Sequence, residues 1–182
     1  MTDEQKLPIP TSHAEILLRG EVMRLFSHIE KSLSVIVLFC QNDVVAETQK
    51  DEAIKFKGMM LHQKIERAIE LLKKYHLKVW EKNKQLFEDL ICLKKFRNRI
   101  AHCPISWDEK DPEFFTIWDI DTAEDNIQYH KGFKYTVTEC KRLLDEIESA
   151  SNKLTDILPD ILSKYTELMR IILAGRTNQK DF

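Results

Sequence analysis

Glycine and proline are scarce in this chain, and that scarcity limits the folds open to it. The 182 residues contain four glycines and five prolines, about 5% of the chain against a usual level of roughly 12%. All-β folds of many short strands need frequent turn residues, whereas long helices do not. The composition therefore favours an all-α fold, and the length suits one domain with a core of its own.

Apolar residues recur at helical spacing over most of the chain. A first helix is predicted from about residue 12, where Ser12 and Glu15 form a capping-box pattern. A second helix is predicted over 61–75, and a third carries the stripe Leu86, Leu90 and Leu93 and ends before Pro104. Helices with one apolar stripe each bury these stripes against one another. We therefore expect helix-on-helix packing.

The segment of about 113–137 is richer in aromatic and β-branched residues than the rest of the chain. Two or three short antiparallel strands are predicted there. Helical periodicity returns from Thr138, which is expected to cap the last helix, and Pro159 either kinks that helix or begins another. The predicted fold is an all-α, antiparallel bundle of four to five helices with a small β-hairpin insertion after the third helix.

A single domain is predicted over residues 12–175. Residues 1–11 include two prolines and are expected to form a flexible N-terminal arm, and residues 176–182 form a polar tail. The longest apolar run, Leu33–Cys40, is far shorter than the ~20 residues of a membrane-spanning helix. The first residues show no signal-peptide pattern. We expect a cytoplasmic protein without a membrane partner.

The four cysteines are widely spaced, and none belongs to a CxxC pair. Structural zinc sites use ligands paired at short spacing, so no metal site is predicted. Free thiols fit a reducing compartment.

Charge is distributed unevenly along the chain. Residues 64–99 contain eleven basic and five acidic side chains, a net charge of +6, and residues 108–128 contain eight acidic side chains and one lysine, a net charge of −7. Solvated helix faces followed by an acidic loop explain this pattern. A positive face for a polyanion beside an acidic segment is the alternative explanation, and charge alone does not decide between the two.

The end of the third helix carries the cluster with the most catalytic character. No phosphate-binding glycine loop, HExxH zinc motif or GxSxG nucleophile motif occurs in the chain. Arg97 falls on the apolar stripe, where a guanidinium needs an anion, a partner charge or an interface. Asn98 and His102 are four residues apart and share a helical face. These three residue types can bind a phosphodiester and move protons, although an interface salt bridge at the end of an ordinary helix would use them too.

The run Arg97-Asn98-Arg99-Ile100-Ala101-His102 resembles the R-x4-6-H motif of the HEPN superfamily (higher eukaryotes and prokaryotes nucleotide-binding). The resemblance covers roughly residues 14–158 and includes the polar residue after the arginine and the position at the end of a third helix. It implies a metal-independent endoribonuclease without a cofactor, often a toxin or an antiviral defence effector, which acts on RNA as a homodimer. Attack by the RNA 2′-OH would leave a 2′,3′-cyclic phosphate.

The resemblance also implies a role for each residue of the motif. His102 would exchange protons with the 2′-OH, Arg97 would stabilise the charge on the phosphorane, and Asn98 would orient the phosphate or the histidine. An acid on the first helix, Glu30, is expected to meet Arg97. The predicted RNA-binding residues lie on the basic face of the second and third helices: Lys94, Lys95 and Arg99.

Two features of the sequence depart from the pattern of HEPN toxins. Some of those toxins continue the motif as His-x-Tyr, whose tyrosine a partner nucleotidyltransferase modifies, whereas Cys103 and Pro104 follow His102 here. The net charge is −2 at pH 7, whereas many RNA-binding domains are basic. The sequence leaves open whether an antitoxin or regulatory partner exists. Two alternatives remain, a non-catalytic HEPN-like dimeric module that binds nucleotide, RNA or a protein, and a helical interaction protein whose motif is coincidental.

Overall fold

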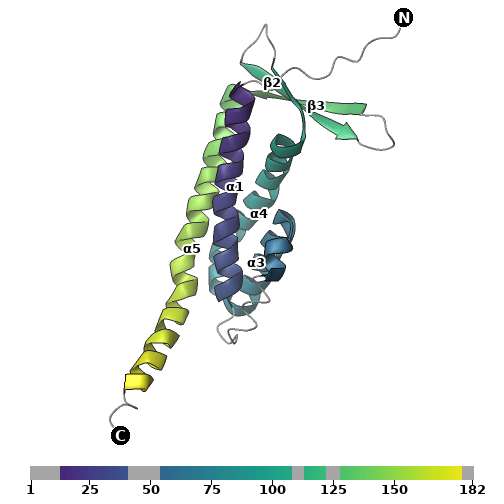
Figure 1. Cartoon of the computed structure of the whole chain (residues 1–182). Helices are drawn as coiled ribbons and strands as arrows, with labels where there is room; N and C mark the ends of the chain where they lie inside the picture. Colours follow the sequence, from purple (N-terminus) through teal and green to yellow (C-terminus); the bar gives the residue numbers. More distant parts are fainter. Residues whose placement is uncertain (1–12, 41–53, 108–112, 122–127, 178–182) are drawn as a thin grey trace, which may run out of the picture. The chain divides into compact units, whose positions relative to one another are not determined.

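The computed structural model describes residues 13–40, 54–107, 113–121 and 128–177. These residues form a mainly helical chain with one three-stranded antiparallel sheet (Figure 1), which confirms the mainly α fold. The predicted N-terminal arm and most of the polar tail lie outside the described residues. The chain divides into two compact units, a first unit of Met1–Ser27 with Cys92–Ser149 and a second unit of His28–Ile91 with Ala150–Phe182.

Two helices of the structure begin close to where the sequence predicts them, one at His13 and one at Leu61. A short helical stretch covers 54–58. The longer helices are α1 (His13–Phe39), α3 (Leu61–Tyr75), α4 (Leu77–His102) and α5 (Val137–Thr177). The strands are β1 (Ile105–Trp107), β2 (Phe114–Asp121) and β3 (Gln128–Thr136).

A single residue separates α3 from α4. The N–H of His76 donates to the Leu72 carbonyl at 2.8 Å and closes α3. The carbonyl of His76 accepts from the N–H groups of Val79 and Trp80 at 2.9 and 3.0 Å and opens α4. The chain therefore changes direction here without a glycine or a proline, and α4 starts at Leu77, well before its predicted apolar stripe.

The last helix begins and continues differently from the prediction. Its cap is Thr136, because the Thr136 hydroxyl accepts from the Glu139 N–H at 3.0 Å and the Glu139 carboxylate accepts from the Thr136 N–H at 2.8 Å. The predicted cap, Thr138, lies inside the first turn.

Pro159 does not begin a new helix, since α5 runs through it to Thr177. A proline removes one helical hydrogen bond. Ile157 and Ile161, two residues before and two residues after Pro159, are both buried, so the helix stays packed on either side of the proline.

The sheet belongs to the first unit and is larger than the predicted hairpin. Its strand order is β1-β2-β3, with Ile105 paired to Ile117 and Phe115 paired to Tyr135. The hairpin is β2–β3, and β1 is an additional strand, so the insertion begins at Ile105 rather than near 113. A strand of three residues is too short to show alternation in the sequence.

The two faces of the sheet differ in burial. Phe115 and Ile117 are fully buried on the inner face, which in Figure 1 lies against the first turns of α1 and α5 and the last turns of α4. On the other face the Trp118 indole N–H donates to the Ser106 hydroxyl at 2.8 Å. Gly132 opposite Trp118 leaves room for this ring, because a Cβ at 132 would lie 3.1 Å from the indole and 2.8 Å from a Thr116 methyl carbon.

The second unit is helical within the described residues. The carboxylate of Glu30 on α1 forms an ion pair with Lys64 on α3. The Trp80 ring lies 5.6 Å from the Phe87 ring on α4. The interior of this unit is aliphatic and aromatic, and its fully buried members include Ile29, Leu33, Ile36, Ile65, Leu71, Leu72, Phe87 and Leu90.

Candidate functional site

The last turns of α4 carry the three candidate catalytic residues. Leu93 and Ile100 of the apolar stripe are buried, and Arg97 between them is half-buried. Asn98 and His102 are exposed and are separated by about one helical turn. The site therefore combines a guanidinium set into an apolar stripe with an amide and an imidazole that face solvent.

The guanidinium of Arg97 reaches the face that carries Asn98. Its Nη1 donates to the Asn98 side-chain oxygen at 3.2 Å. Its Nε is buried and has no hydrogen-bond partner among the described residues. A buried N–H without a partner destabilises a fold by about 1–3 kcal/mol. Arg97 thus has hydrogen-bonding capacity that the described part of the chain does not use.

The backbone around His102 is held by neighbouring elements. The N–H of Cys103 donates to the Arg99 carbonyl at 2.9 Å and closes the last turn of α4. The carbonyl of Pro104 accepts from the Trp118 N–H at 2.9 Å, which ties the chain after the motif to β2. His102 therefore lies at a defined helix end rather than in a loop.

The three predicted RNA-binding residues have different environments. Lys95 is exposed and Lys94 is half-buried. The Arg99 guanidinium stacks on the Phe133 ring at 3.6 Å and donates to the Tyr135 hydroxyl at 3.3 Å. Arg99 therefore holds α4 against β3, and Lys95 is the more accessible cation beside Asn98 and His102.

Sequence reasoning missed the residues that support the motif. Phe133 and Tyr135 point to one face of β3, and their alternation predicted a strand without showing that its partner would be Arg99. Arg19 of α1 donates hydrogen bonds to the backbone of the turn that contains His102. The sequence pattern around Arg19 does not predict this contact, because Arg19 lies more than eighty residues before that turn.

Glu30 was expected to meet Arg97, and that contact stays a prediction. Glu30 belongs to the second unit, whereas Arg97 belongs to the first. Within its own unit the Glu30 carboxylate is ion-paired with Lys64.

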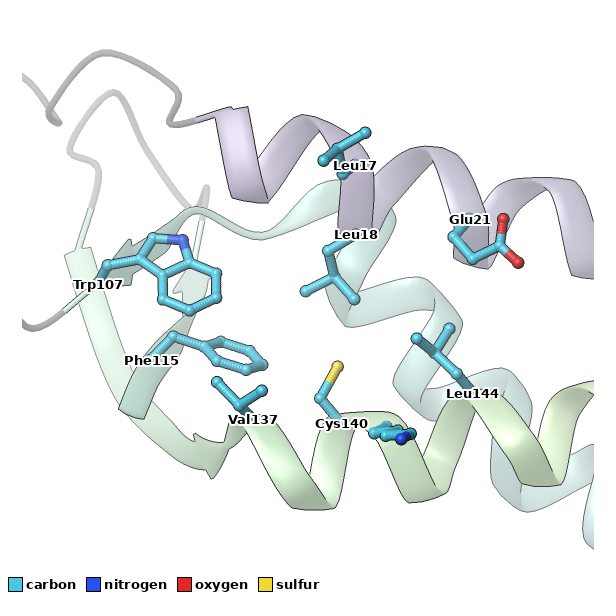
Figure 2. Close-up of a pocket in the computed structure, with 9 residues that line it drawn as sticks. Leu17, Leu18, Glu21, Trp107, Phe115, Val137, Cys140 and Leu144 are labelled. Atoms are coloured by element: carbon cyan, nitrogen blue, oxygen red, sulfur yellow. The ribbon is translucent and has the colours of Figure 1, made fainter. Parts of the chain in front are cut away.

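An open apolar pocket of about 320 Å³ lies between α1, the sheet and α5 in the first unit (Figure 2). Leu18, Phe115 and Cys140 line it, and Figure 2 shows the Cys140 sulfur pointing from α5 toward the Leu18 side chain. Burial raises the pKa of the Cys140 thiol to about 11, so the thiol is protonated at neutral pH and is a poor nucleophile. The motif residues do not line this pocket.

Among the described residues, no group of three or more histidine, cysteine, aspartate or glutamate side chains is arranged to hold a metal ion. No helix in the described part of the chain combines the length and the apolar character needed to cross a bilayer.

Comparison of the chain with protein-family models, with curated proteins and with solved structures gave no match. Membership of the HEPN superfamily therefore stays a prediction from the motif and its place at the end of α4.

Proposed function

We propose that this chain is a metal-independent endoribonuclease of the HEPN type, with the antiparallel helical bundle of that superfamily. The observation that supports the proposal is the arrangement on the last turns of α4. An exposed histidine lies one turn from an exposed asparagine, and an arginine with an unused buried N–H reaches that asparagine.

The reaction would be transesterification within the RNA strand. The imidazole of His102 accepts the proton of the 2′-OH, and the 2′ oxygen forms a bond to the adjacent phosphorus. The bond between phosphorus and the 5′ oxygen breaks, and the imidazolium returns the proton to that oxygen. The products are a 2′,3′-cyclic phosphate and a 5′-hydroxyl. Arg97 stabilises the negative charge of the phosphorane, and Asn98, which contacts Arg97, holds the guanidinium in place.

The proposed enzyme acts as a homodimer. Arg97 and His102 are five residues apart, which in an α-helix means a rise of about 7.5 Å and a rotation of about 140°. One chain thus directs the two side chains to different faces of α4. A two-fold interface would bring Arg97 of one copy toward His102 of the other.

Cleavage of a mixed RNA pool tests this proposal. Wild type should cleave in excess EDTA, and light scattering should give a mass of about twice 21.5 kDa. His102→Ala should lower the rate by about 10²–10⁴-fold, because it removes the proton-transfer group. The fold and the dimer should survive, since the lost side chain is exposed.

A matched variant separates binding from chemistry. Lys94→Ala with Lys95→Ala should weaken RNA binding and flatten its salt dependence, while bound RNA is still cleaved. If wild type cleaves RNA only after Mg²⁺ or Mn²⁺ is added, the roles of Arg97 and His102 are wrong. If wild type binds RNA without cleaving it and His102→Ala binds equally well, the chain is a binding module instead.

A further inference from the structure

The Ile100 carbonyl near the end of α4 lacks its usual helical donor. In an α-helix the carbonyl of one residue accepts from the N–H four residues later. For Ile100 that residue is Pro104, which has no N–H. The Cys103 carbonyl lies beyond the helix and has no place in its hydrogen-bond ladder. This end of α4 therefore needs donors from elsewhere in the fold.

Arg19 of α1 supplies these donors. Its Nη1 donates to the Ile100 carbonyl, and its Nη2 donates to the Cys103 carbonyl at 2.7 Å. Nε and Nη2 also donate to one carboxylate oxygen of Glu15, at 2.8 and 2.6 Å. The four bonds use four of the five N–H donors of the guanidinium. Arg19 is thus oriented by one acid on its own helix and directed at the turn of His102.

We propose that Arg19, held by Glu15, is a positioning residue for His102, an inference that rests on the proposed ribonuclease function. The two carbonyls that Arg19 contacts, those of Ile100 and Cys103, lie on either side of His102 in the sequence. Fixing both limits the movement of the His102 backbone and therefore the space that the imidazole can reach.

The pair acts through geometry rather than through charge. Glu15 is buried, and the Arg19 side chain is 26% exposed, so the contact is partly shielded from solvent. The carboxylate balances the guanidinium, and little net charge is added beside the imidazole. A displacement of about 1 Å in a catalytic group can lower a rate by about 10²-fold. Holding the end of α4 is therefore sufficient to affect the reaction.

The test compares Arg19→Met with Arg24→Met. Arg24 lies on the same helix and forms an exposed ion pair with Glu21 at 2.6 Å, so it controls for loss of an arginine from α1. Arg19→Met should lower kcat by about 10–100-fold and change KM by less than about threefold. Hydrogen exchange at the Cys103 amide should become about tenfold faster or more. Arg24→Met should leave all three quantities unchanged.

A conservative variant and an independent readout keep the inference open to refutation. Arg19→Lys retains the charge with a single donor group and should be intermediate in both kcat and exchange, and it replaces Arg19→Met if that variant does not fold. Faster exchange at Cys103 with unchanged kcat would make Arg19 a helix cap without a role in positioning. Unchanged exchange would overturn the inference outright. An inactive wild type would overturn the proposed function, and the exchange rate would still show whether Arg19 holds this turn.

Discussion

Replacing Arg97 with methionine should stabilise the fold while it slows the proposed RNA cleavage. Arg97 lies between the buried residues Leu93 and Ile100, and its buried Nε has no partner in the described part of the chain. Methionine is also unbranched and favours helix, and it brings no polar group into the stripe. The substitution therefore removes an unsatisfied donor without removing the apolar stem.

The magnitude follows from two opposing contributions. Removing an unsatisfied buried N–H gains about 1–3 kcal/mol. Losing the 3.2 Å bond from Arg97 to Asn98 loses about 0.5–1 kcal/mol, because one of its members is exposed. The free energy of unfolding should rise by up to about 2.5 kcal/mol, which for a chain of this length raises Tm by up to about 10 °C.

Thermal and urea unfolding measure this change, with Arg142→Met as the control. Arg142 is exposed and forms an ion pair with Glu146 on α5, so its loss should change stability by less than about 0.5 kcal/mol. Both variants should be measured at protein concentrations above and below the dissociation constant of the proposed dimer. Cleavage by Arg97→Met should fall by about 10²–10³-fold, as for removal of one donor to a developing charge.

A loss of stability in monomeric Arg97→Met would refute this reasoning, because it would mean that the Nε group already has a partner within the chain. A loss seen only where the chain dimerises would show that Arg97 contributes to the proposed interface. A stable Arg97→Met variant with full activity would remove Arg97 from the site.

Two further predictions concern ionisable groups outside the motif. Hydrogen bonds from the backbone N–H and the hydroxyl of Thr136 lower the pKa of Glu139 below 4.5, so its stabilising contribution is present above about pH 4.5 and is lost as the pH falls through the lowered value. The difference in Tm between wild type and Glu139→Gln should therefore shrink as the pH falls below about 4.5, and a difference that does not change with pH would contradict the cap. Burial raises the pKa of Cys40 to about 12 and that of Cys140 to about 11, so a disulfide reagent at neutral pH should modify the exposed Cys92 first and these two only after unfolding. Equal reaction rates would show that the two thiols are accessible in the folded chain.

The sequence indicated much of the candidate site because the motif is local. Arg97, Asn98 and His102 lie within two turns of one helix, and helical spacing alone relates their faces. The exposure of Asn98 and His102 in α4 agrees with that spacing. The partner of Arg99 could not be predicted in this way, because the stacked ring of Phe133 comes from a strand that the chain brings back to α4.

Element boundaries were predictable only where local chemistry determines them. The scarcity of glycine and proline and the apolar periodicity indicated a mainly helical chain, since both act over one or two turns. The break at His76 carries no glycine or proline, and the proline inside α5 does not end that helix. The end of α3 at Tyr75 nevertheless agrees with the predicted helix over 61–75. At Pro159, packing of the buried neighbours Ile157 and Ile161 outweighs the local preference of proline.

The sequence by itself determined the helical class of this protein and the surface of α4 that presents its histidine. The tertiary structure decided how that surface is supported. Arg19 meets the end of α4 from more than eighty residues away, and β1 and β2 fasten the chain just beyond it. Such contacts depend on which distant segments the fold brings together. The periodicity of apolar residues indicates only the neighbours of a residue within a few helical turns.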